Sequence, residues 1–113
     1  MGHYLHRTVD FLGVTAPVLR DSSLLSGLLI AAAGAAGFSS SFGSTVHERV
    51  TGSTAMLVLE GDGCHVAAHA FPDRELLLLD LLVPEGRDTD KAIDVFVRKL
   101  NAKSVRRNEV RRA

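Results

Sequence analysis

A cysteine and two histidines lie close together near the middle of the chain, in the segment GDGCHVAAHAFPD at residues 61–73. Cys64 is the only cysteine of the chain, and His65 and His69 follow it. A cysteine whose pKa is lowered by an imidazole is a nucleophile. Gly63 also leaves room near the preceding carbonyl, so the Cys64 sulfur could attack its own upstream peptide carbonyl in an N-to-S acyl shift. The plainer interpretation is a small apolar cysteine in a strand.

A metal site is a second interpretation of the same segment, because thiolate and imidazole are ligands of zinc. Alternate residues of a strand face opposite sides, so Cys64 and His69 would diverge, whereas His65 and His69 share a face. A fourth ligand is not evident. We therefore expect no metal.

The composition predicts a single globular domain over residues 1–113, with 46% apolar residues. Lysine and arginine balance aspartate and glutamate at 13 each, so no net charge attracts nucleic acid or a membrane surface. The basic stretch 103–112 lacks aromatic residues for stacking on bases. The apolar stretch 28–38 has only 11 residues, whereas a membrane span needs about 20. One cysteine cannot form an internal disulfide, which favours the cytoplasm.

Turn signals and hydrophobic periodicity divide this domain into strands and helices. Thr51-Gly52-Ser53 and Gly61-Asp62-Gly63 are typical of turns between strands. Strands are predicted over 3–14, 39–50, 54–60, 64–70, 75–83 and 104–112, and helices over about 19–36 and 87–102. Asp21 or Ser22 can cap the first helix, and Asp88 or Thr89 the second. The expected fold is α+β, a two-layer sandwich with an antiparallel sheet and two helices on one face.

Four motifs, taken in order, resemble the prokaryotic S-adenosylmethionine decarboxylases, which are small pyruvoyl enzymes of spermidine and polyamine biosynthesis. H-x-x-x-D-F at 6–11 is similar to the family's H-x-x-x-E-F, and STVH at 44–47 matches S-T-[FV]-H. CHVAAHAFPD at 64–73 resembles S-H-x-x-x-H-T-W-P-E, and LLLLDLLVPEG at 76–86 lines up with A-x-x-D-[LI]-F-T-C-G. The order and spacing of the motifs carry the resemblance.

The resemblance implies a chain that cuts itself and converts the residue after the cut into a pyruvoyl group. That group forms a Schiff base with the substrate amine and accepts electrons as CO2 leaves. Carried over by position, the cut falls between Gly63 and Cys64, and Cys64 is the precursor of the pyruvoyl group. His69 takes the place of the processing histidine and Thr54 that of the processing-loop serine.

The substrate contacts implied by the resemblance fall on His65, Val66 and Asp73, with Asp73 at the position of the ribose-binding acid. The chain departs from the family at other positions. The expected cut lies at Gly-Cys instead of Glu-Ser, and the family's proton-donor cysteine falls at Pro84 or its neighbour. The aromatic residue that stacks on adenine falls near Arg49 or Val50.

Two functions remain open on these residues. One is a self-processing lyase that decarboxylates S-adenosylmethionine or a related amino acid. The other is a non-catalytic paralogue that dimerises with a partner decarboxylase or regulates it. The resemblance implies a homodimer, or a heterodimer with a paralogue. Loss of the Glu-Ser pair and of the donor cysteine favours the second function, and the cluster around Cys64 favours the first.

Overall fold

The computed structural model describes residues 2–38, 43–48, 52–60 and 63–113. Its elements run in the order β1 (Tyr4–Leu12), α1 (Ala16–Leu19), α2 (Ser22–Ala35), β2 (Gly43–Glu48), β3 (Thr54–Glu60), β4 (Cys64–Phe71), β5 (Leu76–Pro84), α3 (Thr89–Leu100) and β6 (Ser104–Arg112), with a short 3-10 turn at Pro72–Arg74 between β4 and β5. Several positions used in the sequence analysis lie outside the described residues: Arg49, Val50, Thr51, Gly61 and Asp62.

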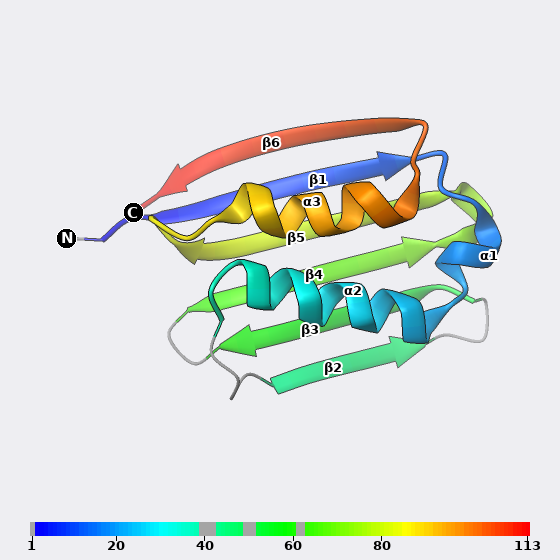
Figure 1. The fold of residues 1–113 in the computed structure, drawn as a ribbon, viewed down its shortest axis with the longest axis horizontal. Helices are drawn as coiled ribbons and strands as arrows, with labels where there is room; N and C mark the ends of the chain where they lie inside the picture. The colour runs from blue at the N-terminus through cyan, green and yellow to red at the C-terminus, as the bar shows by residue number, and fades with distance from the viewer. Residues whose placement is uncertain (1, 39–42, 49–51, 61–62) are drawn as a thin grey trace.

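One antiparallel sheet of six strands, in the order β2-β3-β4-β5-β1-β6, forms the first layer of the molecule. Helices α2 and α3 lie side by side across one face of this sheet and form the second layer (Figure 1). The predicted α+β two-layer sandwich is therefore confirmed. The other face of the sheet carries no helix among the described residues (Figure 1).

The predicted helix over 19–36 is two helices, because the chain leaves the helical conformation at Asp21. Asp21 has φ −86° and ψ 85°, and its carboxylate accepts a hydrogen bond from the backbone N–H of Leu24 at 3.0 Å. The side chain thus satisfies one of the free donors at the start of α2. Asp88 caps α3 in the same way, accepting from the N–H of Lys91 at 3.0 Å. Both predicted caps are confirmed, and the break before α2 is the correction.

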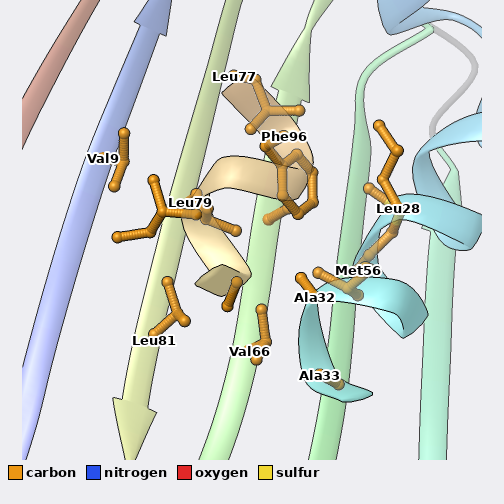
Figure 2. Close-up of a cluster of buried hydrophobic side chains, with 14 of the residues drawn as sticks. Val9, Leu28, Ala32, Ala33, Met56, Val66, Leu77, Leu79, Leu81 and Phe96 are labelled. Carbon is orange, nitrogen blue, oxygen red and sulfur yellow. The ribbon is translucent and has the colours of Figure 1, made fainter. Parts of the chain in front are cut away.

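The hydrophobic core lies between the helices and one face of the sheet. Figure 2 shows Phe96 of α3 beside Leu77 and Leu79 of β5 in this buried cluster. Leu28, Ala32 and Ala33 of α2 approach the sheet near Met56 of β3 (Figure 2). Small alanines let α2 lie close to the strands, and every second residue of β4 and β5 is buried. Cys64 and Val66 belong to this buried face.

Strand β1 comes from the start of the chain but lies between β5 and β6, which come from its end. Tyr4 is paired with Pro84 on one side and with Arg112 on the other. The N-terminal strand is thus hydrogen-bonded along both edges by strands of the C-terminal half. A single break between β3 and β4 would leave two fragments that interlock in one sheet.

Candidate active site

The helix-free face of the sheet, which we call the open face, gathers most of the polar residues singled out above. His6, Leu82 and His65 lie next to one another in a row across β1, β5 and β4. Thr8, Asp80 and Ala67 form the next row. Because side chains of paired residues project to the same face, both imidazoles stand one row from the Asp80 carboxylate.

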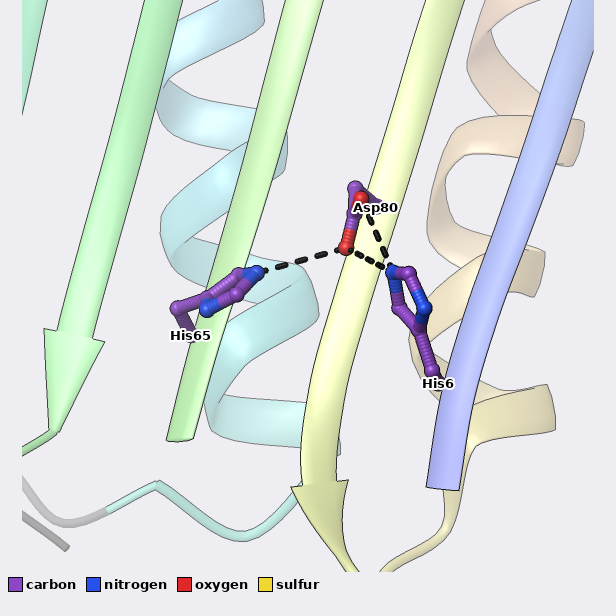
Figure 3. Close-up of polar contacts among 3 residues, drawn as sticks. All are labelled: His6, His65 and Asp80. Carbon is purple, nitrogen blue, oxygen red and sulfur yellow. Dashed lines mark hydrogen bonds and ion pairs between the residues drawn. The ribbon is translucent and has the colours of Figure 1, made fainter. Parts of the chain in front are cut away.

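Asp80 holds both histidines through hydrogen bonds (Figure 3). The Nε2 atom of His6 lies 2.9 Å from Oδ1 and 3.0 Å from Oδ2 of Asp80, and Nε2 of His65 lies 3.3 Å from Oδ1. All three side chains are partly exposed, at 28%, 30% and 38% for His6, His65 and Asp80. With Nε2–H donating to the carboxylate, Nδ1 of each neutral imidazole is an acceptor. The cluster can therefore orient two bases on the open face.

No role was predicted for His6 or Asp80, although the sequence carries signals for both. Asp80 is the only charged residue in the apolar run LLLLDLLV, and a carboxylate inside such a strand needs a partner. The partner itself could not be named, because His6 lies 74 residues away in the chain. His65, in contrast, was predicted as a site residue, and it lies in this cluster.

Cys64 points away from this cluster, into the core. Its side chain is 2% exposed and lies on the face that the helices cover. Strand alternation places His65 and His69 on the opposite face. His69 is five residues further along β4, or about 16 Å at the usual strand rise. The expectation that one of these imidazoles activates the thiol is therefore not met within one intact chain.

Two further predicted site residues lie in the core. Thr54 is 5% exposed and pairs with Ala70, at the end of β4 opposite to Cys64. Val66 is completely buried between Cys64 and Ala68 along the same face. The structure thus does not bring Thr54 to the predicted cut, and it gives Val66 a packing position. Val66 belongs to the same motif as His65 and His69, but the pleat of β4 turns it to the opposite face.

A hollow on the open face surrounds His69. His47, Ala55 and His69 form one row across β2, β3 and β4, and the small alanine leaves a groove between the two imidazoles. This groove has a volume of about 310 Å³. Phe71 stacks on His69 with ring centroids 6.4 Å apart. The groove is mainly apolar, with a histidine at each side.

Asp73 lies beyond this groove, in the turn after β4. Its Oδ1 atom is 3.3 Å from an NH2 nitrogen of Arg20, and both side chains are exposed. The guanidinium of Arg74 lies 5.6 Å from the centre of the Phe71 ring. Asp73 is therefore a surface carboxylate paired with an arginine, and it lines a separate hollow together with Ser53, Phe71, Pro72 and Arg74.

A separate hollow opens beside the predicted cut. It has a volume of about 220 Å³ and is lined by Tyr4, Gly63, Leu82, Arg112 and Ala113. Gly63 directly precedes β4 and has a φ of +75°, the left-handed conformation that side chains disfavour. The glycine before Cys64 thus has a structural reason to be glycine.

Within the described residues, no group of three or more His, Cys, Asp or Glu side chains has the geometry of a metal site. Those residues also include no helix of the length and apolarity that a membrane crossing requires.

Comparison with known proteins identifies the family. A family model described as S-adenosylmethionine decarboxylase matches residues 5–113. A crystal structure of the adenosylmethionine decarboxylase from Aquifex aeolicus VF5 has the same fold, with a TM-score of 0.86 and 21% identity over 99% of this chain and 92% of that chain. A search of curated proteins gives no significant match. Because the family match extends over nearly the whole sequence, the chain belongs to the S-adenosylmethionine decarboxylase family.

Proposed function

We propose that this chain is a carboxy-lyase of the S-adenosylmethionine decarboxylase type, and that it makes its own reactive carbonyl group by cutting itself between Gly63 and Cys64. The substrate is S-adenosylmethionine or a related amino acid. The observation that carries the proposal is the conformation of the cut site. Gly63 has a φ of +75° directly before Cys64, at the point where β4 begins.

The position of the cut favours processing without loss of the fold. Strand β3 ends before the cut and strand β4 begins directly after it, so each strand remains whole after cleavage. The new N-terminal fragment keeps β1, which stays between β5 and β6 of the other fragment. The two fragments therefore remain one sheet, held by the same backbone hydrogen bonds and the same core.

The thiol of Cys64 is the nucleophile of the first step. Its Sγ adds to the Gly63 carbonyl carbon, the C–N bond breaks, and the thiol proton ends on the departing nitrogen. The product is a thioester with a free amine. A base then takes the Cα proton of Cys64, and the sulfur leaves as a thiocarboxylate on Gly63, so that an amino-acrylate remains at position 64. The amino-acrylate takes up a proton at its methylene carbon and becomes an imine. Water then replaces the nitrogen, which leaves as ammonia, and gives the pyruvoyl group.

The residues present fit such a group, since position 64 becomes a chain terminus beside the hollow lined by Tyr4, Gly63 and Leu82. A pyruvoyl group there would supply an electron sink for decarboxylation of an amine-bearing substrate. His65 stands next to it and faces the open face, where Asp80 orients its ring. His65 can therefore accept or return a proton near the reacting carbon. Asp73, beyond the far end of β4, stays the residue that we propose for binding hydroxyl groups of the substrate, as the resemblance implies.

A second copy of the chain is the proposed partner, and it covers the open face. That face carries the partly exposed leucines 57, 76, 78 and 82, and Leu59 at 53% exposure, with no helix over them in the described part of the chain. Burying them against another sheet is favourable. We expect a dimer by light scattering, and a monomeric Leu78→Asp variant. A wild-type protein that is monomeric would contradict this.

The cytoplasm is the proposed location, since the chain has one cysteine and its family acts on a small soluble metabolite.

A non-catalytic paralogue that binds or regulates a partner decarboxylase is the competing function. The burial of Cys64 in the core and the proline at position 84 favour it. Release of CO2 from carboxyl-labelled S-adenosylmethionine, with amino acids tested in parallel, separates the two. We expect release by the wild-type protein, none by Cys64→Ala, and inhibition by phenylhydrazine, which captures carbonyl groups. If neither the wild-type protein nor Cys64→Ala releases CO2, the result favours the paralogue.

A further inference from the structure

Tyr4 places a phenol beside the predicted cut, although it is 59 positions away in the sequence. It is the first residue of β1, and its partner on β5 is Pro84. If Gly63 carried a Cβ atom, that atom would lie 3.2 Å from the Tyr4 Oη and 3.5 Å from Cε1. The hydroxyl end of the ring therefore sits directly against the residue whose carbonyl the thiol must attack.

Other polar side chains of the open face are less well placed for this carbonyl. His69 lies about 16 Å along the strand from Cys64. The imidazoles of His6 and His65 donate to Asp80, one row further from the cut than Leu82. Arg112 shares the hollow with Tyr4, but the contact that the structure gives to Gly63 is the phenol. Tyr4 is thus the hydrogen-bond donor that faces the predicted cut.

We propose that Tyr4 is a catalytic residue of the self-processing step, donating a hydrogen bond to the Gly63 carbonyl oxygen while that carbonyl is tetrahedral. The inference rests on the proposed self-processing at Gly63 and Cys64. As the S–C bond forms, negative charge grows on the oxygen, and the phenol O–H stabilises it. The charge returns to the carbonyl when the C–N bond breaks, so Tyr4 ends the step with its own proton.

The absence of a side chain at position 63 belongs to the same arrangement. A Cβ atom there would press on the phenol at 3.2 Å, and the positive φ would strain it further. Glycine therefore lets the phenol approach the carbonyl closely. Gly63 thus leaves its backbone open to the phenol of Tyr4, and Tyr4 supplies the hydrogen-bond donor.

The test follows cleavage from the moment of synthesis. The full chain is made in a cell-free system, samples are quenched in acid, and the fraction of fragments is measured by denatured mass spectrometry. We expect Tyr4→Phe to slow cleavage by about 10²-fold or more, the usual loss on removing one oxyanion donor. Thr8→Val, which removes a hydroxyl from the same strand and face, should cleave at the wild-type rate.

A second measurement uses the fact that Tyr4 is the only tyrosine of the chain. Growth on fluorinated tyrosine changes this phenol alone and leaves its size nearly unchanged. Because fluorine acidifies a phenol, the donor proton is lost at lower pH. We expect the fall of the cleavage rate on the alkaline side to move to lower pH. A residue that only supports the fold would leave this profile where it was.

The outcomes separate the two proposals. Wild-type cleavage with an equal rate in Tyr4→Phe, or an unmoved pH profile with fluorotyrosine, overturns the role of Tyr4 and leaves self-processing standing. A wild-type chain that stays intact overturns self-processing, and the role of Tyr4 with it. Slow cleavage in Tyr4→Phe together with a shifted profile supports both.

Discussion

Replacing Gly63 with alanine tests the backbone conformation at the predicted cut. At a φ of +75° an alanine costs about 1–2 kcal/mol relative to glycine, since its Cβ crowds the neighbouring carbonyl. Its Cβ would also lie 3.2 Å from the Tyr4 hydroxyl, which the flexible end of that side chain can relieve. The free energy of unfolding of Gly63→Ala should therefore fall by about 1–2 kcal/mol.

The assay is urea unfolding followed by circular dichroism, with Cys64→Ala in every chain so that cleavage does not interfere. Gly27→Ala is the matched control. Gly27 lies inside α2 with no atom within 4 Å of an added Cβ, so alanine there should raise the free energy of unfolding by about 0.5–1 kcal/mol. The same substitution thus has opposite signs at the two positions. A neutral or stabilising Gly63→Ala would refute the left-handed conformation on which the proposed cut depends.

Three other predictions concern the cluster, the core and the cut chain. Asp80→Asn should lower the free energy of unfolding by about 1–2 kcal/mol, because two imidazoles lose a charged acceptor that is partly screened by solvent; an unchanged urea midpoint would show that the cluster carries no stability. Phe96→Ala should cost about 3–5 kcal/mol, since Phe96 is fully buried between α3 and the sheet, and a loss below about 1 kcal/mol would contradict that packing. After cleavage, the fragments should elute together by gel filtration in buffer and apart in denaturant; separation in buffer would contradict the interlocked sheet.

Local patterns were sufficient for most elements of the fold. The last strand was predicted over 104–112, the range that β6 occupies, because a helix end and an extended basic stretch delimit it. Asp21 was recognised as a cap, but the predicted helix was extended back through it. An aspartate that caps a helix is itself outside the helical conformation, so a helix that precedes it must end there. The tertiary position of α1 could not be predicted from the sequence.

The candidate site was less accessible to sequence reasoning, because it is assembled across strands. The motif around Cys64 gathers its members along one strand, where alternation sends Cys64 to the core and His65 to the open face. The contacts on the open face join β1 to β4 and β5, as in the bond from His6 to Asp80. Such pairings depend on the register of β1 between β5 and β6, which no local pattern reports.

The central claim is that the chain cuts itself between Gly63 and Cys64 and keeps the sulfur on Gly63. The denatured intact mass of freshly purified protein tests it most directly, with Cys64→Ser and Cys64→Ala measured beside the wild type. The account predicts two fragments, 1–63 and 64–113. The first should be heavier than a carboxylate end by the difference between sulfur and oxygen, and the second should be blocked. In Cys64→Ser the extra mass should disappear, and Cys64→Ala should stay whole. A wild-type chain with one uncut, unmodified mass would contradict the account.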